Sequence, residues 1–294
     1  MRTYFLFICL FVYYSCSEEN ISLINDIPFG TEESLDIITW NIENFPKHSS
    51  TIDYVADFIL SLNADVIALQ EISNQSDFNL LLDILGDPWT GYISNAGGYQ
   101  TLAYIINTDY VNVLETPYTI LDEYSYFFAY RDPYVLNIEF NNEQYSLINI
   151  HLKCCGDGLL QNNDSDEEYR RLKSAQYLKE YVDYYFEQDQ VIILGDFNDE
   201  LVDDIDNNVF LNFFNDANYY FSDIYIAEGP ASNWSYPGWP SHLDHLLFFN
   251  YPIVDSLNTN TLLLDNYMIG GWDKYDNYIS DHRPVGVSIP RISN

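Results

Sequence analysis

The fold is decided by the stretch Val191–Asn198, which reads VIILGDFN. Three of its first four residues are β-branched, and an unbroken apolar run of this kind is typical of a strand that is buried on both faces. Gly195 ends the run, and Asp196 and Asn198 follow at once. A buried strand that ends in a carboxylate and an amide predicts a polar site at one edge of a sheet.

The same arrangement recurs along the chain, because polar residues follow or precede several other strand-like runs. These residues are Asn41, Glu43, Glu71, His151, His242, Asp244, His245, Asp281 and His282. If the strand ends share one edge of a sandwich, they bring together carboxylates, amides and imidazoles without a thiolate. Oxygen-rich ligation of this kind suits a hard cation, Mg²⁺ first and Mn²⁺ or Ca²⁺ next. Two imidazoles beside a metal-bound phosphate could activate water and protonate a leaving oxygen, so the pattern indicates phosphate ester hydrolysis.

Helical and strand-like patterns alternate over the rest of the chain. Helices are expected over residues 51–62, 76–85, 166–186 and 209–214. Strands are expected over residues 34–40, 66–70, 100–106, 126–130, 134–140, 144–150, 191–194, 245–249, 260–265 and 285–289. Asn141-Asn142 is typical of a hairpin turn, and Ser165 with Glu168 matches a capping box for the long helix. The many strand-to-strand connections favour an α/β fold with two packed sheets and helices outside.

Six short motifs in a fixed order carry a family resemblance. They are Ile38-Thr39-Trp40-Asn41, Leu69-Gln70-Glu71, Asn149-Ile150-His151-Leu152, Gly195-Asp196-Phe197-Asn198, Leu243-Asp244-His245-Leu246 and Ser280-Asp281-His282-Arg283-Pro284. With them the chain resembles the endonuclease/exonuclease/phosphatase superfamily, which includes deoxyribonuclease I, over about Leu35 to Pro290. The resemblance implies a four-layer α/β sandwich, in which helices flank two packed mixed β-sheets, as a single domain over residues 34–294.

The resemblance also implies a metal site. Glu71 would be the principal ligand of the divalent cation, and Asn41 and Asp281 would complete or support the site. Glu43 is a further candidate ligand, since some members of the superfamily carry an acid two residues after the Asn and others do not.

The catalytic roles come from the same resemblance. His282 would act beside the scissile phosphate, oriented by Asp244. Asp196 would position or deprotonate the attacking water, and Asn198 would hold a phosphate oxygen. His151 would be a second acid/base or phosphate-binding group; the alternative is a hydrogen-bonded residue of the sheet rim.

The remaining histidines have simpler interpretations. His48 and His242 are expected to be solvent-exposed. His245 follows Asp244 in the alternation of a strand and is expected to pack on its opposite face.

Three arginines are candidates for substrate phosphate binding. Arg131 lies where members of the superfamily often place an Arg near the phosphate, but it could equally form a surface ion pair with Asp132 or another neighbour. Arg170 and Arg171 could form a basic patch that guides a phosphate backbone. They could instead pair with Asp166 and Glu167, each four residues earlier on the same helix.

Two local features near these motifs stay open. Trp234, Tyr236 and Trp239 could stack on a base, or they could pack at the rim of the domain. The adjacent Cys154 and Cys155 could be two reduced thiols or a strained vicinal disulfide.

The N-terminal segment predicts export. Residues 1–15 combine a single charge, Arg2, with an unbroken apolar run that is too short for a membrane span, which takes about 20 residues. This pattern is typical of a signal peptide. Cys16 stands where a bacterial lipoprotein would be lipidated, and residues 16–33 read as an acidic tether. The protein is therefore expected to be secreted or to be a cell-envelope lipoprotein whose Cys16 anchors it to a membrane.

The charge limits the choice of substrate. The formal net charge is -34, with 11 basic residues against 45 acidic ones, which excludes a basic non-specific nucleic-acid binder. The hydrophobic content of 47% excludes an acidic disordered chain. We expect a monomeric, exported, divalent-metal-dependent phosphodiesterase, foremost a nuclease acting on DNA or RNA. The alternatives are a phospholipid or sphingolipid phosphodiesterase and a phosphomonoesterase of the same superfamily.

Overall fold

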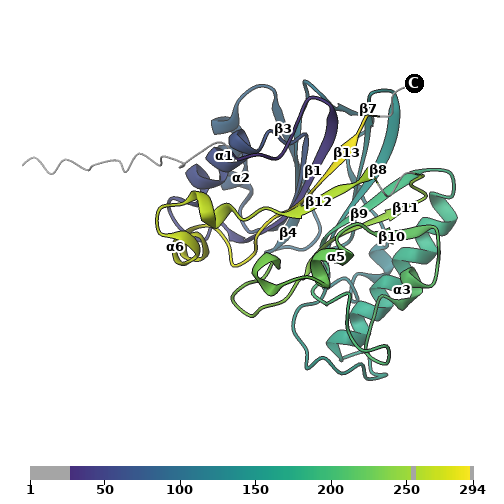
Figure 1. Ribbon diagram of the computed structural model, residues 1–294. Helices are drawn as coiled ribbons and strands as arrows, with labels where there is room; N and C mark the ends of the chain where they lie inside the picture. The colour runs from purple at the N-terminus through teal and green to yellow at the C-terminus, as the bar shows by residue number, and fades with distance from the viewer. Residues whose placement is uncertain (1–26, 253–255, 292–294) are drawn as a thin grey trace, which may run out of the picture.

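The computed structural model describes residues 27–252 and 256–291 and contains two β-sheets packed face to face (Figure 1). The first sheet has the strand order β12 (Asn258–Thr261), β13 (Val285–Pro290), β1 (Ser34–Phe45), β2 (Val66–Ile72), β4 (Thr101–Asn107) and β3 (Trp89–Ile93). The second has the order β10 (Tyr219–Phe221), β11 (Asp244–Phe249), β9 (Gln190–Asp196), β8 (Glu143–His151), β7 (Tyr134–Phe140) and β5 (Asn112–Val113), and β6 (Tyr118–Thr119) also pairs with β7. Both sheets are mixed, since β1–β2 and β8–β9 are parallel and their other neighbours are antiparallel.

Helices cover the outer face of each sheet. On the first sheet these are α1 (Thr51–Leu62), α2 (Gln75–Leu85) and α6 (Gly271–Tyr278), and on the second α3 (Glu167–Tyr185), α4 (Leu211–Phe214) and α5 (Ile224–Ala227). Figure 1 shows α1 and α2 on one side of the sheets and α3 on the opposite side. The predicted four-layer α/β sandwich is confirmed.

Alternation along the strands builds three apolar layers. In β1, Ile38 and Trp40 pack under the outer helices, whereas Ile37 faces the other sheet. In β9, Ile193 packs beneath α3 and Leu194 faces the first sheet. Successive side chains of a strand point to opposite faces, so a strand covered on both faces must be apolar throughout. This is why the run at 191–194 is unbroken.

One predicted strand is wrong. Residues 126–130 follow a short 3₁₀ helix, η1 (Asp122–Tyr124), and form consecutive turns. Ala129 and Tyr130 have φ angles of 53° and 64°, which no strand allows. Aromatic residues favour strands in general, but here Phe128 alone is buried beneath the turns.

Other boundaries move by a few residues. The long helix is capped by the Asp166 carboxylate, which accepts from the amide of Tyr169, and not by Ser165. The predicted strand at 260–265 is β12, at 258–261, and the predicted helix at 209–214 shrinks to α4. The Asn141-Asn142 hairpin is confirmed, with φ angles of 53° and 65° between β7 and β8.

The N-terminal predictions fall largely outside the described residues. The signal peptide at 1–15 and Cys16 lie there, as does most of the predicted tether. The part of the tether that is described, residues 27–33, packs on the domain: Ile27 is buried and the amide of Gly30 donates to the Leu62 carbonyl. The packed structure therefore begins before residue 34. Among residues 27–252 and 256–291, no helix is long and apolar enough to cross a membrane.

Asp65, just before β2, allows the effect of a buried carboxylate on the free energy of unfolding to be tested. Its Oδ2 accepts from the Asp36 amide at 2.8 Å, and burial raises its pKa from 3.8 to about 7. The folded state therefore holds the proton more tightly than the unfolded state, so ionisation costs stability as the pH rises through this window. Asp65→Asn keeps an acceptor without the charge and should raise the free energy of unfolding by on the order of 2 kcal/mol at about pH 8.

Urea unfolding at about pH 8 and about pH 4 measures this difference. At the lower pH Asp65 is already protonated in the folded state, so the variant should gain little there. A variant that is less stable than the wild type at the higher pH would contradict the argument.

Candidate active site

The strand ends form one row of polar residues across the second sheet. In the register of the strands His151 of β8 pairs with Asp196 of β9, and Asp196 pairs in turn with Asp244 of β11. All three side chains are buried. Asn41 of β1 reaches this row from the other sheet, since its Nδ2 donates to Asp196 Oδ2 at 2.9 Å. The shared edge that the sequence predicts is therefore present.

Asp196 lies at the centre of the site. Its Oδ1 accepts from the amide of Asn198 at 2.9 Å, while its Oδ2 lies 3.4 Å from His151 Nε2 and 3.9 Å from His282 Nε2. Burial, together with the carboxylates of Asp244 and Glu71, raises the pKa of Asp196 to about 7. This carboxylate can accept a proton near neutral pH.

His282 is fixed by a carboxylate behind it. Its Nδ1 and Asp244 Oδ2 are 2.8 Å apart, which leaves Nε2 on the side of Asp196. Burial alone would lower the pKa of His282, but Asp244 and Asp196 outweigh it and raise the pKa to about 10. The imidazole is thus held as a cation that presents Nε2–H to the site.

Three further acids, Glu71, Glu43 and Asp281, lie close together beside Asp196 and His282. Glu71 Oε1 accepts from Asn41 Nδ2 at 3.2 Å. Glu43 Oε2 accepts from the Asp281 amide at 3.0 Å and from Lys47 Nζ. Burial, with the carboxylates of Glu43 and Glu71, raises the pKa of Asp281 to about 6. The sequence-predicted ligands are therefore brought together, and Lys47 is a cation at this site that the sequence reasoning missed.

Gln100 was also missed. Glu71 has a φ of 66°, and its Oε2 accepts from Gln100 Nε2 and from the amide of Asn44, both at 2.9 Å. Gln100 is the first residue of the strand predicted at 100–106 and directly precedes β4, but nothing in its local sequence points to Glu71. Only the antiparallel pairing of β2 and β4 places the two residues together.

His151 and Arg131 lie behind Asp196. Arg131 donates through Nε to the His151 carbonyl at 3.0 Å and through Nη2 to the Leu152 carbonyl at 2.8 Å. Burial, together with Arg131 and His282, holds the pKa of His151 well below its usual value. His151 is therefore neutral, and its Nδ1 is buried without a hydrogen-bond partner.

The two helix arginines are held by protein groups. The Arg170 guanidinium lies 4.3 Å from the Tyr126 ring centroid and donates to the Tyr126 carbonyl. Arg171 Nε donates to Asp199 Oδ2 at 2.7 Å, and its Nη1 donates to the carbonyls of Lys153 and Cys155. Both side chains are buried. The pairing with Asp166 and Glu167 is therefore not what holds these side chains. Arg171 also lines the cavity at the site, and the role of Arg170 and Arg171 in substrate binding stays a prediction.

The other three histidines agree with their predicted exposure and packing to different degrees. The expectation that His242 is solvent-exposed is wrong, since it is fully buried. His48 is half-buried and packs on the Tyr278 ring, with centroids 4.2 Å apart. His245 lies on the opposite face of β11 from Asp244, as expected, against Phe197.

A cavity of about 470 Å³ opens in front of the site. Besides Asp196 and His282 its wall includes six acids, Glu71, Glu168, Asp199, Glu200, Asp203 and Asp281. The Tyr236 ring packs on His282 at a tilt, with ring centroids 4.7 Å apart, and Trp239 is 77% exposed at the rim. Trp234 instead donates through Nε1 to the Ile226 carbonyl.

Cys154 and Cys155, which also line the cavity, are free thiols with their sulfurs 2.8 Å apart.

The residues present fit a divalent cation. Glu71, Glu43 and Asp281 supply carboxylate oxygens, the ligands that Mg²⁺ and Ca²⁺ prefer. Their clustering leaves excess negative charge, as the raised pKa of Asp281 indicates. A second group, Asp196, Asp244 and His282, offers three ligand atoms within 4.8 Å. There His282 Nδ1 already faces Asp244 Oδ2, so the carboxylates around Glu71 are the candidate site for the cation.

The fold and this site define a phosphoester hydrolase. Residues 38–282 match the Endonuclease/Exonuclease/phosphatase family, and the chain belongs to that family. Its members depend on a divalent metal ion. No curated protein matches the sequence.

Several solved structures share the fold. TDP2 from D. rerio, complexed with a single-strand DNA product, has a TM-score of 0.67 at 14% identity, covering 88% of this chain and 100% of that one. The human Nocturnin catalytic domain with a bound sulfate anion has a TM-score of 0.56 at 15% identity, covering 87% and 93%. SmcL has a TM-score of 0.59 at 17% identity, covering 87% and 99%. At such identities the likeness concerns the fold alone.

Gln100 allows the cation site to be tested. Gln100→Ala removes the amide that donates to both Glu71 and Asn44 Oδ1. Loss of a group that orients a ligand should weaken Mg²⁺ or Mn²⁺ binding by about tenfold or more. Calorimetric titration of each ion measures the affinity. Gln176→Ala, a change on α3 where Gln176 contacts Lys173, is the matched control, and equal affinity in both variants would refute the role of Gln100.

Proposed function

We propose that this protein is a divalent-metal-dependent phosphodiesterase that hydrolyses nucleic-acid phosphodiester bonds. The observation that carries the proposal is the position of Asp196, a buried carboxylate with its pKa raised to about 7 and flanked by two imidazoles. A proton acceptor poised near neutral pH beside a cationic donor is what general acid–base hydrolysis requires.

Asp196 and His282 have different roles in the proposed reaction. Asp196 orients a water molecule and accepts its proton as that water attacks phosphorus and the bond from phosphorus to the leaving oxygen breaks. His282, held by Asp244, donates its Nε2–H proton to that leaving oxygen, on which negative charge develops. Asn198, two residues after Asp196, supplies a further donor to a phosphate oxygen through its side-chain amide. In the structure this Nδ2 lies 3.3 Å from the Leu152 carbonyl.

The metal ion would be held by Glu71 and Asp281, supported by Asn41 and Glu43. When bound, it supplies Lewis-acid stabilisation of the phosphate charge and attracts a polyanion into an acidic cavity. We identify it as Mg²⁺, with Mn²⁺ or Ca²⁺ as the next choices, because every proposed ligand atom is oxygen.

Nucleic acid is the favoured substrate for two reasons. A structure of the same fold, TDP2 from D. rerio, is complexed with a single-strand DNA product. Trp239 and Tyr236 also line the cavity, where aromatic rings can stack on bases. The acidic wall makes such binding depend on the cation. Of the candidate arginines, Arg171 lines the cavity and Arg131 lies behind it, where it holds the His151 carbonyl.

The substrate class is tested with residues 17–294 and a panel of substrates. We expect nicking of supercoiled plasmid in Mg²⁺ and none in EDTA. RNA, sphingomyelin and an inositol phosphate complete the panel. Lipid cleavage without nicking would replace the nuclease proposal by the lipid phosphodiesterase, and release of inorganic phosphate alone would replace it by a phosphomonoesterase.

The catalytic assignment is tested by substitution. Asp196→Asn and His282→Ala should each lower kcat by about a hundredfold or more, because each removes a proton-transfer group. Asp57→Asn and His48→Gln, on and near α1, are matched controls and should keep wild-type turnover. Circular dichroism verifies folding, and a folded Asp196→Asn variant with normal turnover would overturn the assignment.

We also propose that the protein is exported and lipidated at Cys16, since residues 1–16 carry the sequence pattern described above. A fatty-acid label should appear on the wild type and be absent from Cys16→Ser, which should move from the membrane fraction to the soluble one. An unlabelled, soluble wild type would mean a secreted protein without an anchor.

A further inference from the structure

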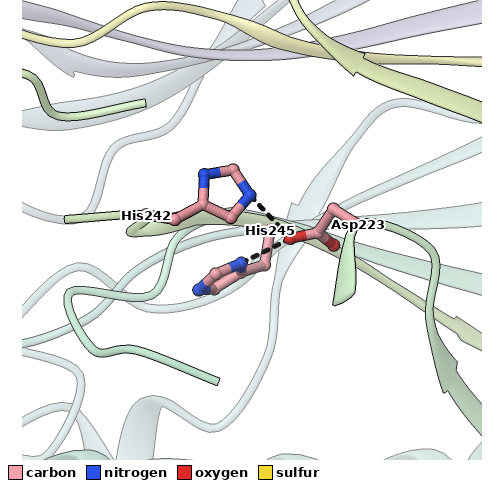
Figure 2. A group of neighbouring side chains, drawn as sticks. All are labelled: Asp223, His242 and His245. Atoms are coloured by element: carbon pink, nitrogen blue, oxygen red, sulfur yellow. Dashed lines mark hydrogen bonds and ion pairs between the residues drawn. The ribbon is translucent and has the colours of Figure 1, made fainter. Parts of the chain in front are cut away.

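A second polar cluster lies behind the active site, on the opposite face of β11. Asp223 precedes α5, and His242 and His245 flank the start of β11 (Figure 2). All three side chains are fully buried. Both imidazoles point at one carboxylate oxygen: Asp223 Oδ2 lies 3.0 Å from His242 Nε2 and 2.6 Å from His245 Nδ1. The mechanism above uses none of these residues.

The hydrogen bonds fix the tautomer of His242. The amide of Ser235 donates to His242 Nδ1 at 3.3 Å, so this nitrogen carries no proton. The proton is therefore on Nε2, from which it is donated to Asp223 Oδ2. A metal ion on Nε2 would require an imidazole without any proton. The cluster thus holds protons and does not have the form of a metal site, although its three ligand atoms lie within 4.8 Å of one another.

The partners of His245 require two protons. Its Nδ1 faces the Asp223 carboxylate at 2.6 Å, and its Nε2 faces the carbonyl of Asp199 at 3.0 Å. A backbone carbonyl only accepts, and so does a carboxylate whose two oxygens already receive N–H donors. Asp223 is such a carboxylate, because its Oδ1 accepts from the amide of Leu246 at 3.0 Å. Both ring nitrogens of His245 must therefore donate, and the ring is an imidazolium.

The surroundings match a buried ion pair. The rings of Phe197, Phe210 and Phe221 surround the His245 imidazole. The titratable groups that face it are Asp223, His242 and Asp244, and Asp199 faces it with its backbone carbonyl. Burial opposes the charge, but the carboxylate of Asp223 outweighs it and raises the pKa of His245. Burial likewise opposes the charge of Asp223, whose pKa the two imidazoles nevertheless hold below its ordinary value.

We propose that His245 is a positioning residue, protonated at neutral pH, for the turn at Asn198, the proposed phosphate-binding residue. Its Nε2–H holds the carbonyl of Asp199, the residue that follows Asn198. Arg171 holds the side chain of the same Asp199 at 2.7 Å. Asn198 has a φ of 55°, which is unfavourable for an L-residue unless its neighbours are fixed. Only the positioning role rests on the proposed function, whereas the charge state follows from the contacts alone.

The sign of the pH dependence follows from the raised pKa. The stabilisation by the His245 charge is fully present below the ordinary pKa of 6.5 and is lost as the pH rises through the higher folded-state value. Between these two values the turn stays fixed only because Asp223 keeps the proton on the ring. Without the carboxylate, the proton would leave near neutral pH and one of the two donors would be lost.

Imidazole ¹⁵N NMR of the wild-type protein tests the charge state without any measurement of turnover. The chain has five histidines, so single substitutions assign the signals. At about pH 7.5 we expect His245 to show both nitrogens protonated and His242 to be neutral with its proton on Nε2. A neutral His245 at that pH would overturn the inference.

Asp223→Asn tests the positioning role. Its amide oxygen can still accept from one imidazole, but the variant lacks the charge that keeps His245 protonated. We expect the His245 signal to titrate near or below pH 6.5, and kcat to fall about tenfold between about pH 6 and pH 8 relative to the wild-type profile. His48→Gln should keep the wild-type profile.

The two measurements separate the possible failures. An Asp223→Asn variant whose His245 loses its proton while kcat keeps the wild-type pH profile would refute the positioning role. If Asp223→Asn prevents folding, the wild-type NMR spectrum still decides the charge state of His245. The kinetic comparison then uses His245→Gln, which keeps one hydrogen-bond donor without the charge. Absence of phosphodiesterase activity in the wild type would refute the proposed function and leave the spectrum as a valid test.

Discussion

The structure depends on a polar connection between two sheets that otherwise meet through apolar side chains. Asn41 of β1 donates to Asp196 of β9, and behind it Gln70 Nε2 donates to Asn149 Oδ1 at 2.8 Å. Asn149 in turn donates to the Leu69 and Ala103 carbonyls. A buried amide or carboxylate without its partner costs about 1–3 kcal/mol, so these groups accept only one alignment of the sheets. That alignment brings the ligands around Glu71 up to the proton-transfer groups around Asp196.

Negative charge concentrated at this junction explains the chemistry we propose. Most of the acids of a chain with net charge -34 need no partner, since they can face water. The few that are buried behave differently: one of them, Asp244, fixes His282 as a cation, and Asp223 does the same for His245 on the other face of the strand. The adjacent residues Asp244 and His245 thus belong to two different imidazolium–carboxylate pairs. Asp244 pairs with His282 on the side of the cavity, and His245 pairs with Asp223 on the side of the core.

The sequence predicted the parts of the site that are local to strand ends. Asn41, Glu71, His151 and Asp196 each follow an apolar run, and the rule that such ends share an edge places them correctly. The errors concern residues whose partners are distant in the sequence. Arg171 is held by Asp199, His242 by Asp223 and Glu71 by Gln100, and no local pattern encodes those pairings. The false strand at 126–130 has the same cause, because its aromatic residues pack on α3, as with Phe127 on Tyr177, and not in a sheet.

The order of the strands has a consequence for biosynthesis. β13, at the end of the chain, pairs with β1, at its beginning, and the loop that enters β13 carries Asp281 and His282. During translation β1 therefore lacks one of its two neighbours until the segment that carries Asp281 and His282 has been made. The proposed cation ligands Glu71 and Asp281 and the proposed catalytic imidazole cannot meet before that point, so the site is completed by one of the last of the described segments to be synthesised.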